Sequence, residues 1–148
     1  MPETVIRYTE DVEGIRADQL TGGFFEGWPN RPNPLTRLAL LHQSDHVVLA
    51  LDASTGDVVG FVTALTDGVL SAYVPLLEVL PPYRGRGIGT ELVRRLLATL
   101  DGLYMVDLLS DPELQPFYAQ FGFQPATGMA HRNYVAQGGR LPRRSQPD

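Results

Sequence analysis

A segment rich in arginine and glycine, residues 84–90 (Arg-Gly-Arg-Gly-Ile-Gly-Thr), has the clearest chemical meaning in this sequence. It follows an apolar run typical of a strand and precedes an apolar spacing typical of a helix. The first turn of a helix has unpaired N–H groups and a partial positive charge, and glycines let an anion approach the backbone closely. The segment therefore predicts a phosphate or pyrophosphate cradle. A tight strand-to-helix turn that merely needs glycines is an equally open interpretation.

Two common nucleotide loops do not fit this segment. A Walker loop requires a lysine after its last glycine, and the chain contains no lysine. A dinucleotide-binding turn belongs to an early strand–helix–strand unit, whereas residues 84–90 lie in mid-chain after a predicted β-hairpin.

The composition excludes further chemistry. All twelve basic residues are arginines and there is no cysteine, so Schiff-base lysines, thiolate nucleophiles, thiolate zinc sites and disulfides are ruled out. The three histidines, His42, His46 and His131, are scattered, and we therefore predict no metal site.

The charge and hydropathy narrow the class of partner. Seventeen acidic residues against twelve arginines give a net charge of −5, which argues against nucleic-acid binding. No run approaches the ~18 to 20 apolar residues that span a membrane, and the N-terminus lacks a signal-peptide pattern. We therefore expect a cytoplasmic protein that contacts no membrane.

The 148 residues fit one domain, predicted to cover residues 1–136, with 137–148 as a flexible tail rich in Gly, Arg, Pro and Ser. Alternation and turn signals predict strands. Their ranges are 5–8, 46–51, 58–65, 69–80 and 103–109, with two short final strands near 123–126 and 129–136. Apolar spacing and capping residues predict helices. Their ranges are 14–26, about 34–41, 88–100 and 111–121.

These motifs, in this order, resemble the GCN5-related N-acetyltransferases (GNAT). Residues 84–89 have the Arg-x-x-Gly-x-Gly form of that family's acetyl-CoA loop, and residues 117–123 (Phe-Tyr-Ala-Gln-Phe-Gly-Phe) resemble its late helix ending in Gly-Phe. The resemblance covers roughly residues 5–135. Residues 104–123 also resemble a late segment of arylalkylamine acetyltransferases and, more closely, uncharacterised bacterial members.

The resemblance implies an α+β fold. We expect a mostly antiparallel sheet of six to seven strands, splayed between the fourth and fifth, with about four flanking helices. It also implies acetyl-CoA as cosubstrate, without a metal, bound by the backbone of the fourth strand and by the glycine loop. The expected cosubstrate-binding residues are Leu77, Val79, Leu80, Arg84, Gly85, Arg86, Gly87, Ile88, Gly89 and Thr90. An N–H near Val79 would lie by the thioester oxygen, where it stabilises developing negative charge.

By the same resemblance, Tyr118 matches the general acid that protonates the CoA sulfur; a half-buried structural tyrosine is the alternative. Glu78 is the nearest acidic candidate for the base, with a structural ion pair as the alternative. In a regular strand Tyr73, Leu77 and Val79 would share one face and Glu78 would point to the other. A bulge in the family's strand makes that alternation unreliable.

Glu26, Trp28 and the proline-rich loop after them would, by family analogy, lie over the acceptor site. Arylalkylamine members use histidines on the fourth strand; Tyr73 and Pro75 occupy comparable places, so that base is missing and Tyr73 is assigned to the acceptor. The predicted activity is direct acetyl transfer to a small primary amine, and a homodimer is expected because the family often forms one. The alternatives are a non-catalytic acyl-CoA-binding module and a nucleotide-dependent phosphotransferase.

Overall fold

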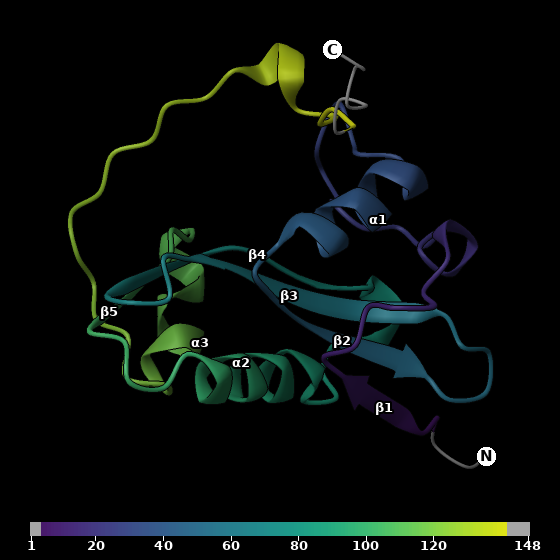
Figure 1. Ribbon diagram of the computed structural model, residues 1–148, viewed down its shortest axis with the longest axis horizontal. Coiled ribbons are helices and arrows are strands. Elements are labelled where there is room, and N and C mark those ends of the chain that lie inside the picture. Colours follow the sequence, from purple (N-terminus) through teal and green to yellow (C-terminus); the bar gives the residue numbers. More distant parts are fainter. Residues whose placement is uncertain (1–3, 142–148) are drawn as a thin grey trace, which may run out of the picture.

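The computed structural model of the chain describes residues 4–141 and shows five strands in one sheet across that range. The strands lie in chain order: β1 (Ile6–Thr9), β2 (His46–Asp52), β3 (Val58–Thr66), β4 (Ser71–Val79) and β5 (Met105–Asp107). The first four pair antiparallel and β5 pairs parallel to β4. Strands β2 and β3 are apolar on both faces because helices and loops cover both (Figure 1).

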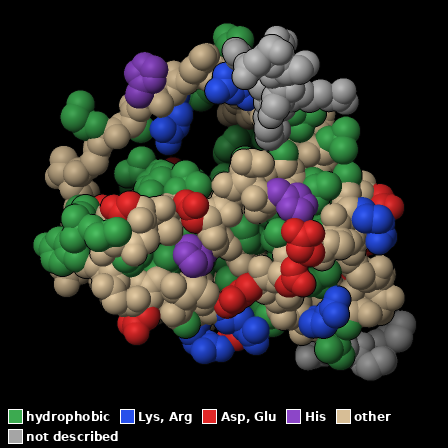
Figure 2. Space-filling model, in the orientation of Figure 1, with side chains coloured by type: hydrophobic (Ala, Val, Ile, Leu, Met, Phe, Trp, Pro, Cys, Tyr) green, Lys and Arg blue, Asp and Glu red, His purple; other side chains and the backbone are tan. Residues whose placement is uncertain are grey.

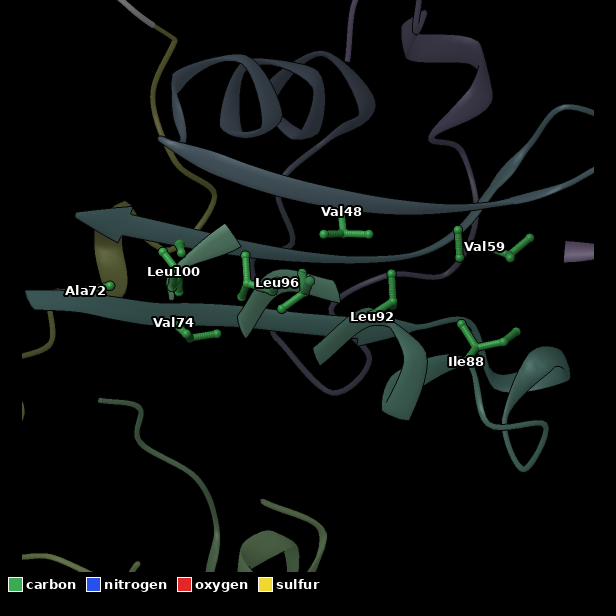
Figure 3. Packing of buried hydrophobic residues seen from close by; sticks show 11 residues of the cluster. Val48, Val59, Ala72, Val74, Ile88, Leu92, Leu96 and Leu100 are labelled. Atoms are coloured by element: carbon green, nitrogen blue, oxygen red, sulfur yellow. The ribbon is translucent and has the colours of Figure 1, made fainter. Parts of the chain in front are cut away.

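Helix α1 (Pro34–Gln43) lies on one face of the sheet and α2 (Ile88–Thr99) on the other (Figure 1). The Asn33 side chain accepts a hydrogen bond from the N–H of Thr36, so α1 begins as the sequence predicts. The apolar stripe of α2 (Ile88, Leu92, Leu96 and Leu100) packs on Val48, Val59 and Val74 (Figure 3). A Cβ at Gly60 would lie 3.1 Å from the Glu78 carbonyl oxygen and 3.2 Å from Leu92, so glycine permits this close packing.

Strand β4 opens away from β5 after three paired residues. The pairing joins Ser71–Tyr73 to Met105–Asp107, and beyond Tyr73 this edge of β4 has no strand partner in residues 4–141. On its other edge, Leu65 pairs with Tyr73 but Thr63 pairs with Leu76, so β4 carries one extra residue in a bulge. The expected splay between the fourth and fifth strands is thus present.

The bulge reverses the alternation of side chains along β4. Before it, Ala72 and Val74 face α2; after it, Leu77 and Val79 do. Glu78, paired with Phe61, and Tyr73 therefore face the α1 side together. A regular strand would have separated them, as the simple alternation predicted.

The prediction of six to seven strands and four helices is wrong: residues 4–141 contain five strands and three α-helices. Segments 123–126 and 129–136 form no strand, and 14–26 holds only a 3-10 turn at Ala17–Gln19. The latter segment buries Phe24 and Phe25, but Phe25 adopts a φ of 60°, a left-handed conformation that a right-handed helix does not contain.

The helix predicted over 111–121 is also shorter than expected. A 3-10 turn (Pro112–Leu114) precedes α3 (Gln115–Ala119), so Pro116 lies in the first helical turn, where its missing N–H costs nothing. Gly122, with a φ of 92°, ends the segment as predicted.

Residues 137–141, the start of the predicted flexible tail, lie against the loop before α1: the Asn30 N–H donates to Gln137 Oε1 over 3.0 Å. The rest of that tail, 142–148, lies outside the described residues. Between residues 4 and 141, no helix has the length and apolar character needed to cross a membrane.

Candidate active site

The glycine loop between β4 and α2 forms an open cradle of backbone N–H groups. Gly85 and Gly87 both have a φ of 78°, the left-handed conformation that glycine adopts without strain. The N–H groups of residues 85–90 donate to no backbone carbonyl in the described chain, and the first helical bond to the loop is from Glu91 to Gly87. This arrangement fits a pyrophosphate, because free donors and the positive end of α2 converge on one place.

Several residues expected to bind the cosubstrate have side chains that pack inside the protein. Ile88 is 2% exposed in the core, and the Leu77 and Val79 side chains pack on the α2 face, so only their backbone is available. The Leu80 side chain contacts buried apolar residues on both the α2 side and the α1 side of the sheet. Gly89, where a Cβ would lie 3.5 Å from Phe117, brings α3 next to the start of α2.

The arginines of the loop have partners within the chain. Arg84 forms an ion pair with Glu26 over 2.9 Å, and its Nε donates to the Val79 carbonyl over 3.1 Å. Arg86 lies over the Tyr83 ring, 5.4 Å from its centroid. This ion pair thus links Glu26, which is predicted to lie over the acceptor site, to Arg84, which is predicted to bind phosphate.

Glu78 occupies a partly buried place where β4 meets the segment before Trp28. Its carboxylate accepts a hydrogen bond from the Phe25 N–H. Burial raises the pKa of Glu78 above its ordinary value, while the Phe25 N–H and the charges of Arg84 and Arg37 oppose that rise. A carboxylate with a raised pKa is suited to accept a proton near neutral pH.

Arg37 and Phe25 were not singled out by the sequence analysis. Arg37, in α1, is buried, and its guanidinium donates to the carbonyls of Leu20 and Gly22 (2.7 Å each) and of Pro32 (2.9 Å). It therefore fixes the segment that presents the Phe25 N–H to Glu78. Its place one helical turn before the core residue Leu41 is the only local signal that could have marked it as inward-facing.

Tyr118, in α3, is half-buried, with its ring edge-on to Phe117 at 5.0 Å and to Phe123 at 6.0 Å. Burial raises the pKa of Tyr118, and the negative charge of Glu78 raises it further. The two predicted proton-transfer groups are therefore close enough to interact, and Tyr118 keeps its proton at neutral pH.

Tyr118 and Tyr73 line a common pocket of about 780 Å³ beside β5. Asp107, Ser110 and residues 122–132 complete its wall. Trp28 lies apart from this pocket, with its ring 4.8 Å from that of Phe25 and 38% of its surface exposed. The predicted acceptor residues thus fall into two groups, Tyr73 by Tyr118, and Glu26 with Trp28 by Glu78.

Within residues 4–141, no cluster of three or more His, Asp or Glu side chains is arranged to hold a metal ion. A separate hydrogen bond, from the Tyr83 hydroxyl to Asp52 over 2.7 Å, ties the approach to the glycine loop to the β2–β3 turn.

Comparison with known proteins assigns this architecture to a family. The model of the Acetyltransferase (GNAT) family matches residues 13–123. A crystal structure of a provisionally assigned acetyltransferase from Deinococcus radiodurans R1 is 45% identical, with a TM-score of 0.88 over 93% of this chain and 94% of that one.

Two curated plant proteins are also similar. GCN5-related N-acetyltransferase 1 (chloroplastic) of Arabidopsis thaliana is 32% identical over 115 residues, covering 76% of this chain and 58% of that protein. Serotonin N-acetyltransferase 2 (chloroplastic) of Oryza sativa subsp. japonica is 36% identical over 66% of this chain and 50% of its own length. The chain therefore spans little more than half of these relatives. With the family model matching most of its length, the chain belongs to the GNAT family of acetyltransferases.

Proposed function

We propose that this acetyltransferase moves the acetyl group of acetyl-CoA directly to the primary amine of a small molecule. The observation that carries the proposal is the open edge of β4, which leads directly into a loop whose N–H groups, residues 85–90, donate to no backbone carbonyl in the described chain. Beside that edge, Glu78 can accept a proton from the amine and Tyr118 can donate one to the leaving sulfur.

The N–H groups of residues 85–90 would bind the pyrophosphate, with Arg84 and Arg86 adding positive charge. The unpaired edge of β4 from Leu77 to Val79 would bind the pantetheine arm through its backbone, with an N–H near Val79 facing the thioester oxygen. The Leu80 N–H is not available for this, because it donates to the Val59 carbonyl. Both side chains of the Arg84–Glu26 ion pair are about half exposed, so Arg84 can exchange this contact for one with phosphate.

In the proposed reaction a C–N bond forms and the C–S bond of the thioester breaks. Glu78 takes one proton of the ammonium group, directly or through a water molecule, and Tyr118 donates its hydroxyl proton to the leaving sulfur. The second proton that the nitrogen loses as the amide forms passes to the Tyr118 phenolate and restores its hydroxyl. No covalent enzyme nucleophile is needed, which agrees with a chain that has neither cysteine nor lysine.

The acceptor is proposed to carry an apolar or aromatic group. Trp28 and Tyr73 are partly exposed aromatic side chains, one beside the Glu78 segment and one beside Tyr118. Similarity to a protein named as a serotonin N-acetyltransferase supports an amine of this kind. A cytoplasmic location remains a prediction from the sequence, as does a homodimer.

The test is incubation of the protein with acetyl-CoA and a panel of amines while released thiol is followed. We expect thiol release that depends on a primary amine and an acetylated product of matching amount. A protein that binds CoA without amine-dependent release would be the acyl-CoA-binding module instead. Thermal stabilisation by ATP but not by CoA would overturn the cosubstrate assignment.

A further inference from the structure

Tyr83, the last residue of the 3-10 turn that precedes the glycine loop, is anchored to the end of β2. Its hydroxyl donates a hydrogen bond to Asp52 Oδ2 over 2.7 Å, between residues 31 positions apart in the chain. Asp52 is 4% exposed, and its Oδ1 accepts from the N–H (2.8 Å) and the hydroxyl (2.6 Å) of Ser54. Because both carboxylate oxygens have partners within the chain, Asp52 is a fixed acceptor for Tyr83.

The charge of Asp52 strengthens this anchor. Hydrogen bonds from Ser54 and Tyr83 lower the pKa of Asp52, so the carboxylate is ionised at neutral pH. The bond to Asp52 raises the pKa of Tyr83, so the hydroxyl keeps the proton that it donates. A hydrogen bond to an ionised acceptor is stronger than one between neutral groups. Tyr83 is therefore held more firmly than ring packing alone would hold it.

The loop that follows Tyr83 has few contacts of its own. A Cβ added at Gly85 or Gly87 would meet no atom within 4 Å, and the N–H groups of residues 85–90 donate to no backbone carbonyl in the described chain. Ordering such a loop when a ligand binds costs conformational entropy, and the cost is smaller when part of the loop is already fixed. The anchor at Tyr83 fixes the start of the loop in this way.

Tyr83 also orients one of the two loop arginines. The guanidinium carbon of Arg86 lies 5.4 Å from the centroid of the Tyr83 ring, and Arg86 forms no ion pair with any residue between 4 and 141. Arg84, in contrast, is paired with Glu26. Arg86 is therefore the loop arginine whose charge is not neutralised by a partner in the described chain.

The surface charge gives such an oriented arginine a larger role. The chain carries a net charge of −5, and the arginine side chains on the face seen in Figure 2 are dispersed or lie beside acidic ones. Without a broad positive surface, a phosphate must be held by single side chains and by backbone N–H groups that are already in place.

We propose that Asp52 and Tyr83 are positioning residues for the cosubstrate: their hydrogen bond holds the start of the glycine loop and places Arg86 toward the pyrophosphate. These roles rest on the proposed use of acetyl-CoA, because the pyrophosphate is the group that the loop would bind. Neither residue touches the thioester or the amine. The Tyr83 hydroxyl should therefore affect a cosubstrate that carries phosphates and leave one without phosphates unaffected.

The test compares acetyl-CoA with S-acetylpantetheine, which has the same thioester but no pyrophosphate, in the wild type and in Tyr83→Phe. The variant keeps the ring beside Arg86 and loses the bond to Asp52. We expect KM for acetyl-CoA and the calorimetric Kd of CoA to rise at least ~5-fold with kcat changed by less than about 2-fold. The value of kcat/KM for S-acetylpantetheine should stay at that of the wild type. Tyr104→Phe, which removes the hydroxyl of a tyrosine that is 84% exposed, is the matched control and should behave as the wild type.

A second pair of variants tests the orientation of Arg86 and leaves Asp52 and Tyr83 intact. Arg86→Met should weaken CoA binding by about 5- to 10-fold, and Arg84→Met should weaken it less, because Arg84 must first leave Glu26. A greater loss in Arg84→Met than in Arg86→Met would overturn the role of Tyr83 in placing Arg86.

Two results with Tyr83→Phe would overturn the positioning role. A lower melting temperature with unchanged KM and unchanged CoA affinity would mean that the hydrogen bond serves stability alone. An equal loss of kcat/KM with S-acetylpantetheine would mean general damage to the site. A wild type that binds no CoA would overturn the proposed function as well, whereas normal CoA binding by both the wild type and Tyr83→Phe would overturn the positioning role only.

Discussion

The two side chains assigned to proton transfer lie in regions that are built in opposite ways. Glu78 belongs to a nine-residue strand, and its carboxylate is held by the backbone of Phe25, which the buried Arg37 in turn fixes. Tyr118 lies on a five-residue helix that contains no buried residue and leads into the exposed segment 124–132. The site of the base is therefore rigid within one chain, while the site of the acid depends on fewer contacts.

The two halves of the site are supported by different kinds of contact. The Glu78 side rests on contacts between β4, α1 and the segment around Phe25, which are far apart in sequence. The Tyr118 side gains its support from Phe117, Phe121 and Phe123, its own neighbours. Substitutions on the two sides should separate loss of stability from loss of turnover.

The largest effect is expected on the acid side. Tyr118→Phe keeps the ring packing but removes the donated proton, so kcat should fall by about 10²–10⁴-fold. Affinity for CoA and the melting temperature should stay close to those of the wild type, as measured by calorimetry and thermal unfolding. Wild-type turnover in this variant would remove Tyr118 from the acid role.

The second-largest effect is expected on the Glu78 side, where the measured quantity is the free energy of unfolding. Arg37→Met leaves the buried carbonyls of Leu20 and Pro32 without their donor, so the free energy of unfolding should fall by about 3 kcal/mol in denaturant titration. The Gly22 carbonyl, its third acceptor, keeps the Phe24 N–H. Arg94→Met is the matched control, since Arg94 lies exposed on α2 and should change stability by less than ~1 kcal/mol. Equal losses in the two variants would show that Arg37 does not fix the Phe25 segment.

The cradle itself should show a smaller effect. Gly87→Ala forces alanine into a φ of 78° although its Cβ meets open space, which costs about 1–2 kcal/mol. If bound CoA requires this loop geometry, its affinity falls by about 10-fold. Gly23→Ala, at an open position without a positive φ, is the control for calorimetric titration. Unchanged affinity in Gly87→Ala would place the phosphates elsewhere.

The smallest effect is expected at the ion pair that joins the two predicted binding regions. Glu26→Gln removes a half-exposed ion pair with Arg84, worth less than ~1 kcal/mol to stability. Because Arg84 is then free to face phosphate, CoA should bind as tightly as before or slightly tighter. A clear weakening of CoA binding would show that Glu26 positions Arg84 rather than competing for it.

The features predicted best from the sequence are those determined by residues that are close together in the chain. The apolar spacing of α2, the Asn33 cap of α1 and the glycines of the cradle are local signals, and the structure confirms the elements they predict. The face of Glu78 was not predictable, because one extra residue in β4 reverses the alternation. The Phe25–Glu78 contact joins residues 53 positions apart, which no local pattern encodes.

The two strands predicted after residue 122 are absent for a different physical reason. Residues 123–126 and 129–136 have the residue types of strands, yet a strand forms only where another edge pairs with it. Within one chain the described residues supply no such pairing. The segment 14–26 fails as a helix because Gly22 and Gly23 disfavour one and Phe25 takes a φ of 60°, although Leu20, Phe24 and Phe25 are buried.

The most direct test of the account is the pH dependence of kcat/KM for the wild type and Glu78→Gln, using an acceptor amine that stays an ammonium ion across the pH range. Because burial raises the pKa of Glu78, the carboxylate is lost as the pH falls through a value above the ordinary glutamate range, and activity should fall with it. In Glu78→Gln that acidic limb should disappear and the plateau rate should be lower. An unchanged limb and a wild-type rate in Glu78→Gln would contradict the pairing of Glu78 with Tyr118 as base and acid.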